Sequence, residues 1–91
     1  MRNRHVIERI HERFNLLITD AQIDLYVKGI QTRKIPIFHK IGDTGSSVHR
    51  IQLTTQVTIY AIYDPRYSKI VTVISYQQFV DRFLTKKYYR R

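Results

Sequence analysis

Apolar residues recur with a helical period in the first third of this chain and with a strand period in the middle. Between residues 3 and 16 they return every three or four positions and so share one side of a helix, for which Asn3 is a suitable N-cap. Thr19 and Gln22 fit a capping box, which predicts a second helix starting at Thr19. The chain is therefore expected to open with two amphipathic helices.

Alternation of apolar and polar residues predicts strands in the middle of the chain. Segments 35–41 and 48–53 fit two strands, and the first belongs at a sheet edge because Pro36 has no N–H to donate. In the stretch 57–76, two arms rich in β-branched and aromatic residues surround Pro65, which suits the second position of a type I turn. Both faces of these arms are apolar, so we expect a central hairpin with at least part of each face covered.

The side chains of this hairpin divide between two faces if each arm alternates strictly. One face would then hold Ile59, Ala61, Tyr63, Ile70, Thr72 and Ile74. The other face would hold Tyr60, Ile62, Val71 and Val73. This assignment decides which side chains can meet a helix packed on the sheet.

The apolar positions near the end of the chain predict a short third helix: Phe79, Val80, Phe83 and Leu84. A basic, aromatic tail of two tyrosines and two arginines follows at residues 88–91. The order of elements predicts one α+β domain over residues 1–87, with two N-terminal helices, a four-stranded antiparallel meander sheet and a short C-terminal helix. We expect the helices to pack on one face of the sheet.

The composition limits the kinds of site that this domain can carry. Its 91 residues include no cysteine, which excludes a disulfide framework and a thiolate metal site. His39 and His49 lie on neighbouring predicted strands and could pair across them, but no residues have metal-ligand spacing, so neither a metal nor another cofactor is expected. No apolar run is long enough to cross a bilayer and the first residues lack the apolar segment of a secretion signal, so a cytoplasmic location is the default expectation.

The unusual property of the composition is its charge. Sixteen Lys and Arg against seven Asp and Glu give a net charge of +9, and ten of the sixteen are arginines, which pair with phosphate through two N–H groups. This surplus favours a polyanionic partner, with RNA or a ribosome first and DNA or an acidic protein as alternatives. A membrane partner is disfavoured because no helix combines a large apolar face with an unbroken basic one. The oligomeric state stays open.

Several cations have positions that suit phosphate binding. His5, Arg9 and Arg13 follow one another at helical spacing along the margin of the first helix. Arg50 lies among apolar neighbours in a predicted strand, where its guanidinium needs water, a carboxylate or a phosphate. Each also has a simpler interpretation as an exposed charge beside the core, and a carboxylate next to Arg50 would make that residue structural.

Further candidates for nucleic-acid contact combine cations with aromatic rings, which together neutralise phosphates and stack on bases. Arg66, Tyr67 and Lys69 lie at the tip of the predicted hairpin. The C-terminal region adds four cations: Lys86, Lys87, Arg90 and Arg91.

These features resemble the barnase–colicin–RelE group of small RNA-cleaving domains, and more narrowly short RelE-like, toxin-related proteins. The matching pieces are the H-x-x-x-R-x-x-x-R spacing from His5 to Arg13, the capped second helix, the strand arginine Arg50 and the IVTVI run at 70–74. The chain departs from the group by lacking an evident strand before its helices.

The resemblance implies metal-independent RNA cleavage, in which a base takes the proton of the ribose 2′-OH and an acid protonates the departing oxygen. His5 would then serve as the acid–base group, because the pKa of histidine lies near cellular pH. Thr72 or Tyr60 would supply a positioning hydroxyl. The phosphate clamp would consist of three arginines: Arg9, Arg13 and Arg50.

The main hypothesis is thus a small basic RNA-binding domain that acts as a ribonuclease. The alternative is a non-enzymatic binder or inhibitor of a nucleic acid or of an acidic host protein, which uses the same basic surface. It stays open because the sequence contains no unambiguous acid–base pair.

Overall fold

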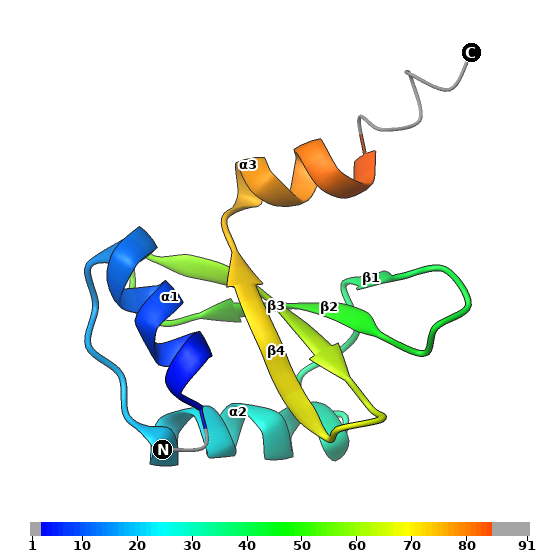
Figure 1. Cartoon of the computed structure of the whole chain (residues 1–91), viewed down its shortest axis with the longest axis horizontal. Coiled ribbons are helices and arrows are strands. Elements are labelled where there is room, and N and C mark those ends of the chain that lie inside the picture. The colour runs from blue at the N-terminus through cyan, green and yellow to red at the C-terminus, as the bar shows by residue number, and fades with distance from the viewer. Residues whose placement is uncertain (1–2, 85–91) are drawn as a thin grey trace.

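Two helices, four strands and a C-terminal helical segment follow one another along the chain, in the predicted order (Figure 1). The computed structural model describes residues 3–84. Its elements are α1 (Arg4–Phe14), α2 (Asp20–Gln31), β1 (His39–Lys40), β2 (Ser47–Gln52), β3 (Thr58–Asp64), β4 (Lys69–Ile74), α3 (Tyr76–Phe79) and the π-helix η1 (Val80–Leu84). The predicted α+β class, with a four-stranded antiparallel sheet, is confirmed.

The two N-terminal helices begin in different ways. At α2 the predicted capping box is present, because the Gln22 N–H donates to Thr19 Oγ1 over 3.2 Å and the Thr19 N–H donates to Gln22 Oε1 over 3.0 Å. Asn3 holds the N-cap position of α1, but its side chain makes no capping bond. Its Nδ2 donates instead to Asp24 Oδ1, 3.1 Å away, and so joins the start of α1 to α2.

The sheet is a meander in the order β1-β2-β3-β4, with antiparallel neighbours throughout. The predicted strand at 35–41 is shortened to β1, the two residues His39–Lys40, and Pro36 lies outside it. β1 forms one edge of the sheet, as expected from a segment that contains proline. β3 lies inside the sheet, whereas β4 forms the second edge, so only one arm of the predicted hairpin is central.

The turn between β3 and β4 has the geometry that its sequence predicts. The Tyr67 N–H donates to the Asp64 carbonyl oxygen over 3.2 Å, which closes a four-residue turn with Pro65 in its second position. Asp64 Oδ1 also accepts a hydrogen bond of 2.9 Å from the Arg66 N–H. Aspartate favours the first position of such turns because its side chain can make this bond.

An extra residue in β4 changes which side chains share a face of the sheet. Tyr60 is opposite Ile74 and Ile62 is opposite Thr72, but the register shifts between Ile62 and the next residue, which leaves Val71 as the extra residue of a bulge. Directly opposed residues point to the same side. Thr72 and Ile74 therefore share a face with Tyr60 and Ile62, and the face predicted for them is wrong because strict alternation ignores a bulge.

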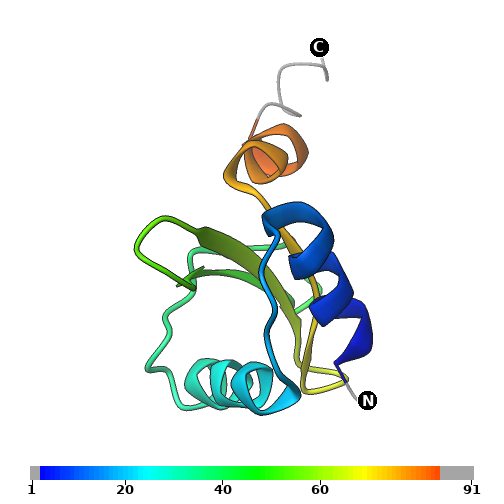
Figure 2. The same ribbon diagram turned by 90° about the vertical axis from the view of Figure 1, so that its left-hand side faces the viewer.

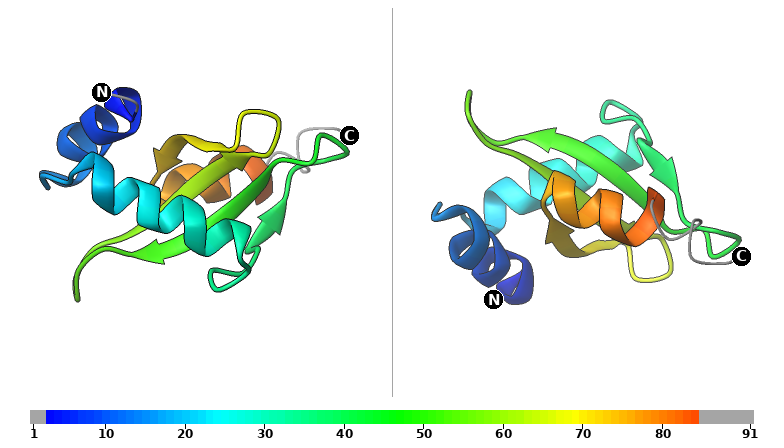
Figure 3. Two further views of the ribbon diagram at one scale, coloured as in Figure 1. Left: turned by 90° about the horizontal axis from the view of Figure 1, so that it is seen from below. Right: turned by 90° about the horizontal axis from the view of Figure 1, so that it is seen from above.

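Helices cover both faces of the sheet, so the expectation that they would pack on one face is wrong. The expectation that each face of the hairpin would be at least partly covered is confirmed. Figure 3 shows α2 crossing the strands in the view from below and α3 crossing them in the view from above, and Figure 2 shows the two helices on opposite sides of the sheet. The buried core under α1 and α2 contains Val6, Ile10, Ile18, Ile23, Ile30, Ile51, Ile59, Ala61, Tyr63, Ile70 and Val73. The core under α3 contains Val48, Tyr60, Ile62, Ile74 and Phe79. β3 is apolar on both sides, so each side needs a partner.

The C-terminal helical segment is fixed at its start and by one aromatic ring. The Gln78 N–H donates to Ser75 Oγ over 3.1 Å and the Ser75 N–H donates to Gln78 Oε1 over 2.9 Å, which forms a second capping box. The buried ring of Phe79 stacks on Tyr60 with 5.6 Å between centroids. Within residues 3–84 no helix has the length and apolar character needed to cross a membrane.

Candidate functional site

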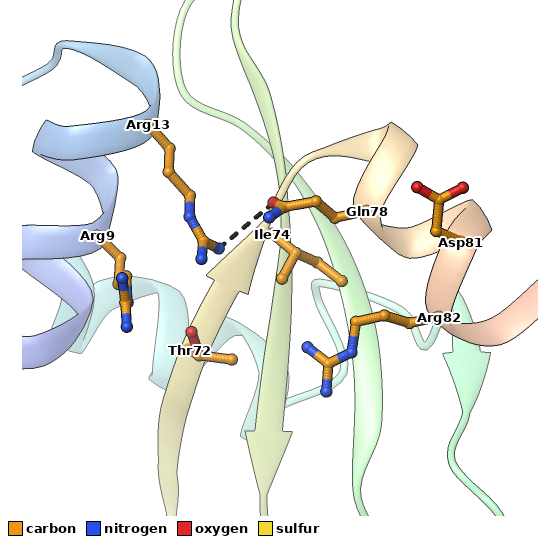
Figure 4. Close-up of a pocket in the computed structure, with 7 residues that line it drawn as sticks. All are labelled: Arg9, Arg13, Thr72, Ile74, Gln78, Asp81 and Arg82. Atoms are coloured by element: carbon orange, nitrogen blue, oxygen red, sulfur yellow. Dashed lines mark hydrogen bonds between the residues drawn. The ribbon is translucent and has the colours of Figure 1, made fainter.

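A basic cleft lies over the edge strand β4, between α1 on one side and the C-terminal helical segment on the other (Figure 4). Its volume is about 350 Å³. The lining residues are Arg9, Arg13, Thr72, Ile74, Gln78, Asp81 and Arg82. Three guanidinium groups thus border a strand that presents a hydroxyl group.

Arg13 holds the two walls of the cleft together. Its Nη1 donates to the Val73 carbonyl oxygen over 2.8 Å and to Gln78 Oε1 over 3.3 Å. The first bond ties α1 to β4. The second, drawn as the dashed line in Figure 4, ties α1 to α3. A guanidinium has five N–H donors in a planar fork, so Nε and Nη2 can still donate to a ligand oxygen.

Arg9 lies one helical turn before Arg13 and is only weakly neutralised. Its Nη1 is 3.3 Å from Glu12 Oε1, and both side chains are well exposed, at 39% and 63%. Exposed pairs of this kind contribute about 0.2–1 kcal/mol, so a phosphate can compete with the carboxylate.

Arg82 completes the cleft from the opposite wall. Figure 4 shows its guanidinium directed toward β4 near Thr72, whereas the carboxylate of its neighbour Asp81 points away from it. Asp81 Oδ1 accepts a hydrogen bond of 3.1 Å from Gln77 Nε2. None of the salt bridges formed between residues 3 and 84 includes Arg82. Its guanidinium lies 5.5 Å from the ring centre of Phe83, a contact that leaves its positive charge available to a ligand.

The structure brings together only part of the predicted phosphate clamp. Arg9, Arg13 and Thr72 meet in the cleft although Thr72 lies far along the chain from the helix. His5 is exposed on α1 one turn before Arg9, and it does not line the cleft. Arg50 is exposed on β2, opposite Tyr60 and two strands from β4, so the expected convergence of Arg50 with the helix is not found.

Sequence reasoning missed Arg82 as a member of the site. Its position beside Thr72 depends on α3 covering the second face of the sheet, and no local pattern reports which face a short helix chooses. The capping box at Ser75 and Gln78 was the available signal, because it fixes where the segment begins.

The cations at the tip of the β3–β4 hairpin lie away from the cleft, at the other end of β4 (Figure 1). Arg66 pairs with Asp64, with 2.8 Å between Nη2 and Oδ2, and this hydrogen bond lowers the pKa of the Asp64 carboxyl. The Arg66 guanidinium also lies 5.6 Å from the ring centre of Tyr67. Arg66 therefore has a structural partner, whereas Tyr67 and Lys69 are exposed.

Four other predicted contacts, Lys86, Lys87, Arg90 and Arg91, lie outside the described residues, as does the rest of the tail at 88–91.

A second concave site lies on the α2 side of the sheet, around a buried histidine. His49 Nε2 is 2.6 Å from Ser47 Oγ, and His49 Nδ1 is 3.0 Å from the Pro36 carbonyl oxygen. Burial lowers the pKa of His49. The predicted pairing of His49 with His39 is wrong, because His39 is opposite Val48 and packs on the α3 side.

Metal-binding residues and comparisons with other proteins were the two remaining sources of evidence on these sites. In the described part of the chain, no three His, Cys, Asp or Glu residues are grouped so that they could hold a metal ion. No family model, curated protein or solved structure matches the chain.

Proposed function

We propose that this chain is a small RNA-binding domain that holds a phosphodiester of single-stranded RNA in the cleft over β4. The observation that carries the proposal is the arrangement of Arg9, Arg13 and Arg82 around Thr72, with Arg82 unpaired by any carboxylate of residues 3–84. Guanidinium groups form the strongest protein hydrogen bonds to phosphate oxygens, since two N–H groups can bind two oxygens.

The size of the cleft favours one nucleotide of a single strand over a duplex. A volume of about 350 Å³ lies at the lower end of the range for small-ligand sites. The resemblance to RelE-like proteins favours RNA over DNA. The net charge of +9 would attract either polymer, so the RNA preference is a separate claim to test.

Binding is favoured over cleavage because none of the described residues that line the cleft is a histidine. Metal-independent cleavage is the second candidate. It is supported by the position of His5 on the same helix as Arg9 and four residues before it, where one helical turn separates an imidazole from a phosphate-binding group.

The binding proposal is tested by fluorescence anisotropy with a labelled single-stranded RNA of mixed sequence. We expect Arg82→Ala to weaken binding about tenfold or more, since hydrogen bonds to charged groups contribute about 1.5–3 kcal/mol. The matched control is Arg50→Ala, which removes the same charge from the sheet outside the cleft. It should change the affinity less than threefold.

Three outcomes would contradict the proposal. Equal losses from Arg82→Ala and Arg50→Ala would show diffuse attraction without a site. Equal affinity for single-stranded DNA would remove the RNA preference. Absence of binding at low salt, together with capture of one acidic protein that resists nuclease, would favour the alternative of a protein inhibitor.

A further inference from the structure

The groove on the α2 side of the sheet contains a serine and a histidine in contact. It has a volume of about 650 Å³, and its lining includes Ser47, His49 and Tyr63. Ser47 and His49 are two residues apart on β2, so their side chains point to the same face of the sheet. Both are buried, and His49 is only 2% exposed.

The hydrogen-bond partners of His49 determine where its proton lies. The Pro36 carbonyl oxygen, 3.0 Å from Nδ1, can only accept a hydrogen bond, so Nδ1 carries the proton. In the neutral ring Nε2 is then an acceptor, and the Ser47 hydroxyl, 2.6 Å away, donates to it. A backbone carbonyl thus orients an imidazole whose free nitrogen accepts the proton of a hydroxyl group.

This is the relation that activates serine nucleophiles. A catalytic base must contact the hydroxyl that it deprotonates, and a third group must hold the base in the correct tautomer. Ser47, His49 and the Pro36 carbonyl meet both conditions in a groove large enough for a small substrate.

We propose that Ser47 is an activated nucleophile, with His49 as its base, and that the groove accepts small carboxylic esters that carry a negative charge. The apolar wall formed by Ile35 and Ile37 would hold the acyl chain. Arg33 and Lys40 line the same groove and would attract the anionic group.

The reaction is an acyl transfer to serine followed by hydrolysis. A bond forms between Ser47 Oγ and the carbonyl carbon while the hydroxyl proton moves to His49 Nε2. The bond between that carbon and the leaving oxygen then breaks, and His49 returns the proton to the departing alkoxide. Water attacks the acyl-serine with the same proton transfer and releases the acid.

One further group is placed to stabilise the oxyanion of the intermediate. The Tyr63 hydroxyl accepts a hydrogen bond of 3.1 Å from Gln31 Nε2, so its own hydrogen can be donated into the groove. This site is on the opposite face of the sheet from Thr72 and is independent of RNA binding. Either proposal can fail without the other.

The test is labelling of the full chain with a fluorophosphonate. Ser47 Oγ would bond to its phosphorus, fluoride would leave, and the hydroxyl proton would move to His49. Mass spectrometry of the digested protein should find the adduct on Ser47. Ser47→Ala should abolish it, and the neighbouring Ser46→Ala should leave its rate within twofold. His49→Gln should slow labelling about 100-fold or more.

A pH series on the unaltered chain gives a second readout that does not depend on a variant folding. The labelling rate should fall in acid with a midpoint below 6.5, as His49 becomes protonated. Folding of each protein is checked by circular dichroism. Absence of a Ser47 adduct on folded protein would overturn the proposal, and so would a labelling rate that neither acid nor His49→Gln reduces.

Discussion

Arg13 donates from Nη1 to the main-chain oxygen of Val73 over 2.8 Å, and this bond joins the first helix to the last strand of the sheet. The same nitrogen is 3.3 Å from Gln78 Oε1, so one guanidinium connects α1 to both β4 and α3, which lie about 60 residues later in the sequence. The cleft over β4 therefore takes its shape from one of its own proposed ligand-binding residues.

Arg13→Ala should lower the free energy of unfolding by about 1–2 kcal/mol, because a partly buried acceptor loses its donor. Arg9→Ala is the matched control, since it removes an exposed surface pair and should cost less than about 0.5 kcal/mol. Urea unfolding of both variants measures the difference. Similar values for the two would show that the bond to Val73 does not stabilise the fold.

Phe79→Ala should reduce both stability and RNA binding, although Phe79 does not line the cleft. Its buried ring holds α3 against Tyr60, and truncation of such a ring typically costs about 3–5 kcal/mol. Loss of this packing would release Arg82 from its position opposite Arg9. Thermal unfolding and RNA anisotropy measure the two effects, with the exposed Leu25→Ala as control. RNA affinity that survives in folded Phe79→Ala would contradict the placement of Arg82.

Asp64→Asn should destabilise the fold at neutral pH but not in strong acid. The hydrogen bond from Arg66 holds the pKa of the folded carboxyl below its ordinary value of 3.8. A depressed pKa contributes stability above the unfolded pKa, and that contribution is lost as the pH falls through the folded pKa. Unfolding free energies of both proteins between pH 7 and pH 2 should therefore converge at the acid end. The control is Asp43→Asn, in an exposed loop, which should leave the unfolding free energy at neutral pH unchanged.

The stability of the chain should also fall between pH 7 and pH 5 because of His49. Burial lowers the pKa of His49 below 6.5, so the unfolded chain takes up a proton in this window before the folded chain does. His49→Gln should make the unfolding free energy less dependent on pH over the same range. An unchanged slope in the variant would show that another group causes the loss.

If the chain cleaves RNA, His5→Ala should slow cleavage about 100-fold while RNA affinity stays within about threefold. The RNA fragments produced by the unaltered chain should carry cyclic phosphate ends, and they should form in the presence of EDTA. Gel analysis and mass spectrometry of the ends measure both properties. Intact RNA after incubation with the unaltered chain, with and without ribosomes, would leave binding as the function.

Local patterns predict much of this fold. The capping box at Thr19 and the turn at Pro65 each depend on a few adjacent residues, whose side chains favour these hydrogen bonds without help from the rest of the fold. The sheet order follows because short connections join antiparallel neighbours. The α+β class could therefore be assigned without coordinates.

Long-range choices were less predictable. The bulge at Val71 reverses the facing of Thr72, and strict alternation of the sequence gives no sign of it. Arg82 and Arg50 have similar sequence surroundings, each a basic residue near apolar ones. Arg82 lines the cleft because α3 packs on the sheet beside it, whereas Arg50 does not line it. The strand predicted at 48–53 includes His49 but leaves out Ser47, which the structure adds to β2. The carbonyl that orients the imidazole belongs to the main chain and has no sequence signature.

The bond from Arg13 to Val73 has a consequence for self-association. An edge strand normally offers unpaired carbonyls to which another chain can add its own strand, a common first step in aggregation. On β4 one of these acceptors is already occupied by a guanidinium from α1. The other edge, β1, is only two residues long and gives an incoming strand little to align with. Both edge strands are thus poorly suited to pairing with a strand of another chain. Removing the Arg13 side chain should make the protein more prone to assemble with copies of itself.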